Sequence, residues 1–210
     1  MSIKDTYIIR QIHPKLANSI QIANHYLHKK ASCIIAFGLF EREDDNLVGV
    51  VLYGNPTAPT TIDICGKENR QNVVELTRLW LSDSCPRNSE SFLISNSMKQ
   101  LSHKIVVSFA DPDYDHVGYV YQATNFLYTG RSGRGGKVIS IKNSKIHNKT
   151  LWKQYGTAAK IREVFGAENV EYIPYTTKHR YVYIRDKRLL SSLKYDIMPY
   201  PKKSGNYVPS

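Results

Sequence analysis

The sequence lacks a run of about 18 apolar residues, and its start, MSIKDTYIIRQI, lacks the basic-then-apolar pattern of a secretion signal. We therefore expect neither a membrane span nor export. Cysteine is scarce, since the chain has only Cys33, Cys65 and Cys85, and none is paired at a metal-ligand spacing such as C-x-x-C. This odd number of cysteines predicts free thiols in a reducing compartment, where disulfides are rare.

No internal repeat or low-complexity segment occurs in the 210 residues, and a hydrophobic content of 41% allows a buried core. The charge is unevenly distributed along the chain. Residues 131–210 carry 17 Lys and Arg against 5 Asp and Glu, a net +12, whereas residues 1–130 carry 12 against 13, a net −1. A basic region beside a near-neutral one is typical of a polyanion partner, usually nucleic acid, although a solubilising surface would give the same count.

Hydrophobic periodicity predicts an α/β fold with a mixed sheet, in the order strand, helix, antiparallel pair, strand, helix, strand, helix, strand. We expect strands over residues 6–12, 33–40, 47–53, 73–82, 104–110, 170–173 and 181–184. We expect helices over residues 16–27, 89–101, 116–125 and 151–165.

The central part of this pattern is a strand, a helix and a second strand over residues 73–110. If the two strands are parallel, they form a right-handed crossover. Ligands of such a unit bind outside the carboxyl ends of the strands. Residues 82–89 and 110–121 then share one rim, where we expect the chemistry.

The string VVELTRLWLSD, a helix start and then IVVSFAD resembles the GCN5-related N-acetyltransferase fold, a mixed sheet flanked by helices. In that family the turn after the fourth strand binds the pyrophosphate of acetyl-CoA through amides at a helix N-terminus. Here this turn reads SCPRNSES, in which Asn88 or Ser89 can cap the helix and Arg87 can add a positive charge. The usual glycine-rich form R-G-x-G-[IL]-G is absent, so an ordinary capped helix is the alternative.

Longer segments are similar to the phage Mom family, from about His25 to Tyr183. They are HYLHKKASCIIAFGLFE, LVGVVLYGNP, ICGKEN, ELTRLWLSDSCPRNSESFLI, KIVVSFADPDYDHVGYVYQATNFLYTG and HRYVYI. The resemblance implies a transferase-like enzyme that converts adenine in phage DNA to N6-carbamoylmethyladenine, which protects the DNA from restriction endonucleases. It also implies iron as a cofactor, an acetyl-CoA-type site, and action in the cytoplasm of the infected bacterial host.

The resemblance assigns catalytic roles to His25, Tyr26, Arg78, Asp111 and Tyr121, with His25 and Asp111 as the metal ligands and Tyr26 as a further candidate. Each residue also has a simpler interpretation. His25 is then a cation at a helix end, Asp111 a turn residue, Tyr121 part of the core, and Arg78 an ion-pair partner of Glu75 or Asp83. The acidic cluster DPDYDH, which ends at His116, can equally cap a turn or stay solvated.

Double-stranded DNA is the expected partner, with the target adenine flipped out of the duplex. We predict an acetyltransferase-like core over residues 1–130 and, over residues 131–210, a basic C-terminal extension that completes the fold and contacts DNA. The expected phosphate contacts are Arg131, Arg134, Lys137, Lys142, Lys145, Lys149, Lys178 and Arg180.

A second copy of the chain is a further candidate partner. An ordinary acetyl-CoA-dependent N-acetyltransferase acting on a protein or small amine is the alternative function, and a non-catalytic DNA-binding protein is a third.

Overall fold

The structure is a computed structural model that describes residues 2–25, 28–133, 137–144, 146, 148–174 and 177–202, without the side chain of Lys149. The chain divides into two compact units. The core unit comprises residues 1–131 and 179–210, and the inserted unit comprises residues 132–178.

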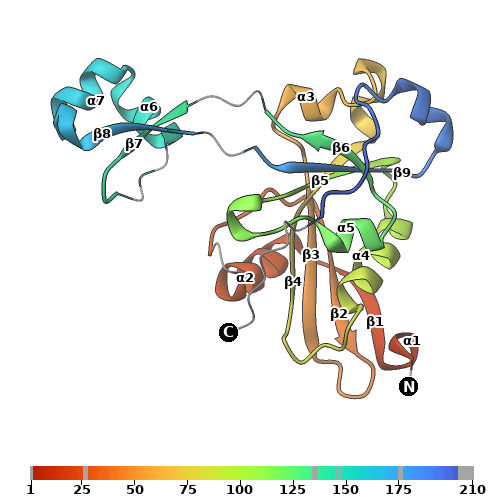
Figure 1. Cartoon of the computed structure of the whole chain (residues 1–210). Helices are drawn as coiled ribbons and strands as arrows, with labels where there is room; N and C mark the ends of the chain where they lie inside the picture. The colour runs from red at the N-terminus through yellow and green to blue at the C-terminus, as the bar shows by residue number, and fades with distance from the viewer. Residues whose placement is uncertain are drawn as a thin grey trace. The chain divides into compact units, whose positions relative to one another are not determined.

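The core unit contains one seven-stranded sheet in the order β1-β2-β3-β4-β5-β9-β6 (Figure 1). Its strands are β1 (Tyr7–Ile12), β2 (Ile35–Glu41), β3 (Leu47–Gly54), β4 (Val73–Leu81), β5 (Ile105–Ala110), β6 (Leu127–Arg131) and β9 (His179–Ile184). All neighbouring strands are antiparallel except β4 and β5, which are parallel. This arrangement confirms the predicted mixed α/β class, the antiparallel pair and the parallel crossover.

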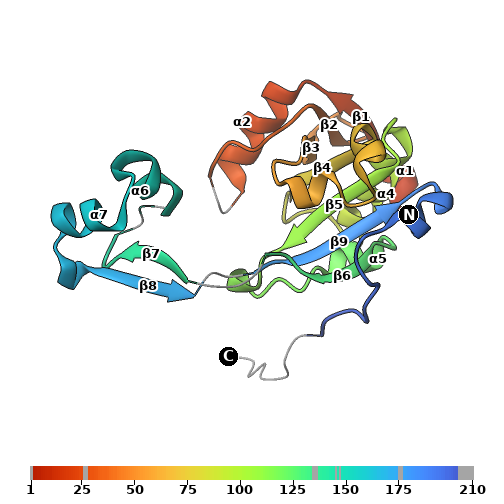
Figure 2. The same cartoon turned by 90° about the horizontal axis from the view of Figure 1, so that it is seen from above.

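Helices cover both faces of this sheet. They are α1 (Ile3–Thr6), α2 (Pro14–Asn24), α3 (Pro59–Ile62), α4 (Ser89–Gln100) and α5 (Tyr119–Ala123). Leu93 and Ile94 of α4 pack with Val51 and Tyr53 of β3, whereas Ala17 of α2 belongs to a separate cluster with Val50 and Leu52. Since successive side chains of a strand point to opposite faces, α2 and α4 lie on opposite sides of the sheet (Figure 2).

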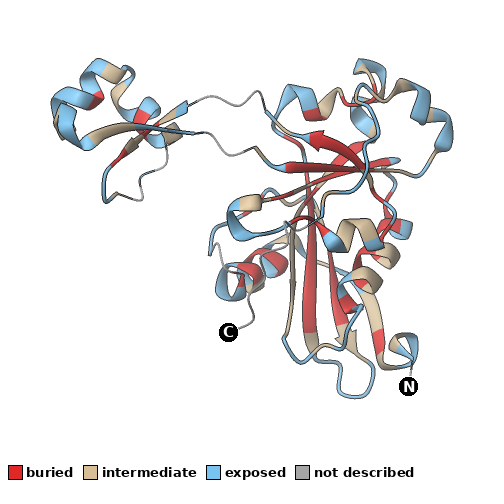
Figure 3. Ribbon diagram, viewed as in Figure 1, coloured by how far each residue is buried: buried red, intermediate tan, exposed pale blue. Residues whose placement is uncertain are grey.

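The central strands are the most deeply buried part of the core unit (Figure 3). In β3 every residue from Val48 to Gly54 is buried. Such a continuous apolar strand is expected where both faces of a sheet are covered. Among the described helices, none combines the length and the hydropathy needed to cross a bilayer.

The basic last third is not a simple extension of a core that ends at residue 130. Strand β9 pairs with β5 on one side and with β6 on the other, so residues from the C-terminal part lie within the main sheet. Beyond β9, the chain runs along the edge strand β6, where the amide of Met198 donates to the carbonyl oxygen of Tyr128 at 2.9 Å. The part of the basic region that folds apart is residues 132–178.

The inserted unit is a two-stranded antiparallel sheet with two short helices. Its elements are β7 (Lys137–Ile141), α6 (Asn148–Tyr155), α7 (Ala158–Phe165) and β8 (Val170–Pro174). The sequence predicted one helix over residues 151–165, and this was wrong. Gly156 has φ +73°, a left-handed conformation that an α-helix cannot contain, so the helix ends at Tyr155 and a second begins at Ala158.

Candidate functional site

The parallel strands β4 and β5 separate near their carboxyl ends. They pair only from Val73 to Glu75 and from Ile105 to Val107. Beyond these residues β4 continues along β3 and β5 continues along β9. The buried hydroxyl of Ser108 donates to the carbonyl oxygen of Leu76 at 2.9 Å, which bridges the strands where the ladder ends. The predicted rim therefore lies where the carboxyl ends of the two strands diverge.

A β-bulge in β4 sets the direction of Arg78. The register with β3 shifts from Leu52↔Arg78 to Tyr53↔Leu76, so Thr77 has no partner of its own. Residues directly opposite each other in an antiparallel pair share a face of the sheet. Because Leu52 packs in the α2 cluster and Tyr53 in the α4 cluster, Arg78 lies on the α2 side and Leu76 on the α4 side.

The guanidinium of Arg78 is only partly satisfied within the described chain. Its Nη1 donates to the carbonyl oxygen of Thr77 at 2.6 Å, while its buried Nε has no hydrogen-bond partner among the residues that the structure describes. A buried donor without a partner is unfavourable unless another group supplies one. Arg78 is thus the described site residue most suited to receive an acceptor from a ligand.

His25 follows the end of α2 on the same side of the sheet. It is 9% exposed, and its amide donates to the carbonyl oxygen of Gln21 at 2.8 Å. Burial, and then the charges of Arg78, His116 and His28, lower its pKa from 6.5 to about 4. His25 is therefore a neutral imidazole at neutral pH, able to donate and accept hydrogen bonds but a weak proton acceptor.

Asp111 organises the loop that follows β5. Its carboxylate accepts from the amide of Asp113 at 3.1 Å, and its carbonyl oxygen accepts from the amides of Tyr114 and His116, both at 3.2 Å. Asp111 caps the 3₁₀ helix η2 (Pro112–Tyr114). The DPDYDH cluster is thus a folded turn, as one of the sequence interpretations expected. The turn leads to His116, whose charge acts on His25.

Tyr121 lies on the other side of the sheet from His25 and Arg78. Its ring is half-buried in the α4 cluster, with centroids 5.4 Å from Phe126 and 5.2 Å from Tyr181. The structure therefore groups His25 and Arg78 on one face and places Tyr121 on the opposite one. Tyr26 lies outside the described residues.

The iron site predicted from the resemblance is wrong. Among the described residues, no three or more His, Cys, Asp or Glu side chains come together in a group that could hold a metal ion. The guanidinium of Arg78 also places a permanent positive charge near His25, which disfavours a cation at the predicted ligand His25. Asp111, the second predicted ligand, has its carboxylate in the turn just described.

The turn before α4 places the predicted cofactor-binding residues at the N-terminus of that helix. The predicted capping of the helix by a side chain is not observed. Asn88 is the N-cap residue in a left-handed conformation, φ +72°, and no side chain caps the helix. The buried Ser89 hydroxyl donates to the carbonyl oxygen of Pro86 at 2.8 Å, and Arg87 is exposed. The helix therefore keeps uncapped amides at its positive end, an arrangement that favours an anion.

The predicted DNA contacts fall into three groups. Arg134 and Lys145 lie outside the described residues, as does the side chain of Lys149. Four cations have exposed side chains, and these are Arg131, Lys137, Lys142 and Lys178. Arg180 is buried and satisfied within the core unit, since its Nε donates to Thr129 Oγ1 at 2.8 Å and its Cζ lies 3.4 Å from the centroid of the Tyr195 ring. We therefore omit Arg180 from the DNA-contacting set.

Sequence reasoning missed the roles of two residues, His116 and Ser108. His116 was read only as part of an acidic cluster, although a turn after a strand can return a side chain towards the site. Ser108 lies inside an apolar strand, where no sequence signal separates a bridging hydroxyl from ordinary core. Tyr181, on the neighbouring strand β9, belongs to the α4 cluster. The Tyr181 hydroxyl donates to the carbonyl oxygen of Val117, and Gln122 Nε2 donates to the same hydroxyl at 3.1 Å.

Among solved structures, the chain is similar to acetyltransferases, with low sequence identity. The ribosomal-protein-S5-alanine acetyltransferase from Vibrio fischeri is 11% identical, with a TM-score of 0.47, and the match covers 86% of this chain and 94% of that one. NAA60 of Arabidopsis thaliana, in complex with a bisubstrate analogue, is 11% identical, with a TM-score of 0.48 and coverage of 85% and 98%. The class of the protein rests on its own elements, a mixed seven-stranded sheet with helices on both faces, which define a mixed α/β protein.

The family is defined more closely by sequence. Residues 6–202 match the Mom protein family. The methylcarbamoylase mom of Escherichia phage Mu is 32% identical over 196 residues, which cover 86% of this chain and 74% of that protein. The chain belongs to the Mom protein family, as the sequence predicted.

Proposed function

We propose that this protein is a phage DNA-modification enzyme that places a carbamoylmethyl group on N6 of adenine and so protects the DNA from host restriction endonucleases. The observation that carries the proposal is family membership over residues 6–202, together with the identity to a protein named methylcarbamoylase. The separation of β4 and β5 supports it, because His25 lies there near Arg78, whose guanidinium is only partly satisfied within the described chain.

The described residues suit distinct roles in such a transfer. The neutral imidazole of His25 would hold the adenine through hydrogen bonds. Arg78 would donate hydrogen bonds to the carbonyl oxygen of the incoming group and stabilise negative charge that develops on it, since a buried donor in a low-dielectric site acts strongly there. Asp111 would position the loop that carries His116. The adenine would reach this rim only after leaving the duplex, because pairing and stacking hinder N6 chemistry within it.

The amides at the N-terminus of α4 suit the phosphate of a donor molecule. Acetyl-CoA is the first molecule to test for binding at this turn, because acetyltransferase-like proteins bind it there, as the sequence resemblance implies. It supplies neither the amide nitrogen nor the two-electron oxidation that a carbamoylmethyl group on N6 requires, so a transfer from it needs a separate nitrogen source and an oxidant. Tyr121 lies on the same side of the sheet as α4. It would therefore face the donor rather than the adenine.

The test is to express the protein in bacteria that carry a plasmid, digest the plasmid to nucleosides and weigh deoxyadenosine by mass spectrometry. We expect deoxyadenosine in which a carbamoylmethyl group replaces one hydrogen, and we expect the plasmid to resist restriction endonucleases. The product should disappear in His25→Gln and Arg78→Met. For Asp111→Asn the matched control is Asp113→Asn, because the Asp113 side chain is exposed. For Tyr121→Phe the matched control is Tyr119→Phe, because Tyr119 is on the same helix and is 57% exposed.

Unmodified plasmid DNA from cells that contain folded protein would contradict the proposed reaction. Acetyl-CoA turnover on amines, without any change in deoxyadenosine, would instead identify an ordinary N-acetyltransferase. Retention of DNA with neither activity would identify a non-catalytic DNA-binding protein.

A further inference from the structure

The inserted unit is built as a closed insertion with a core of its own. Its two ends lie together, since the amide of Ser132 donates to the carbonyl oxygen of Lys178 at 2.7 Å and the amide of Lys178 donates to Ser132 Oγ at 3.1 Å. Between them the two helices pack on the β7–β8 sheet through a buried cluster of Ile139, Ile141, Leu151 and Ile161. An insertion with joined ends and its own core is organised as a separate module.

Positive charge is concentrated in this module. Residues 132–178 carry 9 Lys and Arg against 3 Asp and Glu, a net +6, while the much longer core unit carries 20 against 15, a net +5. Lys160 is neutralised locally by Glu163 at 2.8 Å. Lys142, in the turn after β7, and Lys153, on α6, are exposed and form no ion pair within the described part of the chain.

The module also exposes aromatic side chains. Trp152 is 43% exposed on α6, directly before Lys153. On β8 the side chain of Tyr172 is exposed, and its hydroxyl accepts a hydrogen bond from Arg162 Nη2 at 3.0 Å. A large aromatic side chain in solvent next to a lysine suits a nucleic acid, where the ring contacts sugar or base and the ammonium contacts phosphate.

A membrane surface fits these features less well. A helix that lies on lipid needs one continuous apolar face. On α6 the apolar residues Leu151 and Tyr155 are used in the module's own core, and Trp152 is followed by the exposed Lys153 and Gln154. The exposed surface of α6 is therefore cationic and aromatic rather than continuously apolar.

We propose that the inserted unit is the duplex-docking module of this protein. Trp152 and Lys153 of α6, with Lys142 of the turn after β7, hold double-stranded DNA through its backbone. The module supplies affinity for the duplex, while the chemistry takes place in the core unit. This inference rests on the proposed function for its choice of DNA as the partner.

The test is the affinity of the full-length protein for a fluorescent DNA duplex, measured by anisotropy over a range of salt concentrations. In Lys142→Gln/Lys153→Gln, the loss of two phosphate contacts should reduce the slope of log K against log[salt] by about 2 and weaken binding about 10-fold or more at low salt. The matched control is Lys15→Gln/Lys187→Gln, which removes the same charge from exposed positions of the core unit. The control should bind nearly as the wild type does.

Trp152 offers a direct readout, because the only other tryptophan of the chain is Trp80. In a Trp80→Phe background all tryptophan emission comes from Trp152. Addition of duplex should change this emission, and added salt should reverse the change. Anionic vesicles should not change it.

The outcomes separate this inference from the proposed function. In one outcome the wild-type protein modifies adenine, but the lysine pair variant binds duplex as tightly as the control. This outcome would overturn the docking role and leave the proposed reaction standing. Weaker binding confined to the lysine pair variant, without modified adenine in any sample, would support docking and overturn the reaction. An emission change with vesicles but not with duplex would also overturn the docking proposal.

Discussion

The ring of Tyr181 lies against Gly118, and its hydroxyl donates a hydrogen bond to the carbonyl oxygen of Val117, the residue just before that glycine. A Cβ atom at residue 118 would overlap the tyrosine ring. Gly118 also has φ +79° at the N-terminus of α5, a backbone conformation that residues other than glycine rarely adopt. The contact links β9 to the helix that carries Tyr121.

Gly118→Ala should therefore destabilise the protein through two effects. The left-handed backbone costs about 1 kcal/mol for alanine, and the overlap with a fully buried ring adds about 1–3 kcal/mol. Urea unfolding followed by circular dichroism measures the sum. Gly156→Ala is the matched control, since its φ is +73° but nothing lies within 4 Å of the new Cβ. Equal losses in both variants would show that the contact with Tyr181 contributes nothing.

The order of elements was predictable from sequence because apolar periodicity and turn residues act locally. Strands β2, β3, β4 and β5 were predicted within one or two residues, and the parallel crossover from β4 to β5 was predicted correctly. Pairing across long separations was not predictable. The position of β9 between β5 and β6 depends on contacts of Val182 with Ile105 and Val107, which no local pattern reveals.

Part of the site was predictable only through family resemblance. The approach of Arg78 to His25 depends on the bulge at Thr77, which directs Arg78 to the α2 side, and on the end of α2 at Asn24. Neither feature has a distinctive sequence signal. The error over Arg180 has a related cause, since a basic residue in an apolar strand looks the same in sequence whether it meets solvent or a buried threonine and tyrosine.

The pKa of His25 should respond to Arg78. NMR titration of the wild-type protein should give a pKa of about 4 for His25, far below 6.5. In Arg78→Met the pKa should rise, because one of the charges that disfavours the imidazolium is gone. It should stay below 6.5, since burial is the larger cause. A pKa that is unchanged in Arg78→Met would show that the two side chains do not interact.

The same shift predicts how stability depends on pH. The unfolded chain binds more protons at His25 than the folded chain does between pH 6.5 and about 4. The contribution of His25 to stability is thus present above pH 6.5 and is lost as the pH falls through this window. Urea unfolding at pH 7 and pH 5 should show a smaller decrease for His25→Gln than for the wild type. An equal decrease would assign the acid sensitivity to other groups.

Arg180 should behave as a structural residue and Arg131 as a surface one. Arg180→Gln removes charge-assisted hydrogen bonds to the side chain and carbonyl oxygen of Thr129, and it removes the stacking on Tyr195, so it should destabilise the core unit by about 2–4 kcal/mol. Arg131→Gln changes an exposed side chain and should alter stability by less than about 0.5 kcal/mol. Thermal unfolding of both variants measures the difference. A stable Arg180→Gln variant with weakened DNA binding would restore Arg180 to the DNA-contacting set.

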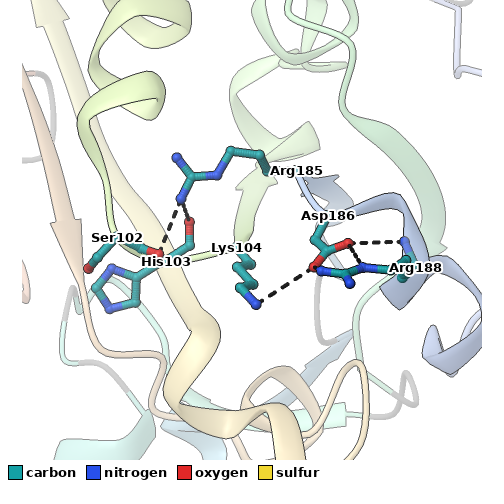
Figure 4. A network of polar contacts seen from close by, with 6 residues as sticks. All are labelled: Ser102, His103, Lys104, Arg185, Asp186 and Arg188. Carbon is teal, nitrogen blue, oxygen red and sulfur yellow. Dashed lines mark hydrogen bonds and ion pairs between the residues drawn. The ribbon is translucent and has the colours of Figure 1, made fainter.

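Arg185 fixes the end of β9 to the turn between α4 and β5 (Figure 4). Its Nη2 lies 2.7 Å from the carbonyl oxygens of Leu101 and His103, and 3.2 Å from that of Ser102. Arg185→Lys keeps the charge, but the lysine side chain is one bond shorter and its ammonium does not reach the position of Nη2, so we expect a loss of about 1–2 kcal/mol in urea unfolding.

Arg188→Lys is the control for this substitution. Arg188, whose side chain is exposed, pairs with the half-buried Asp186 at 2.8 Å in the same region (Figure 4). Arg188→Lys keeps the charge of this pair, and water screens the exposed cation, so little stability should be lost. This variant should unfold at the wild-type urea concentration. If Arg185→Lys did the same, the carbonyl contacts would be no more than incidental, and the anchoring of β9 would rest on its strand pairing and on the packing of Val182 alone.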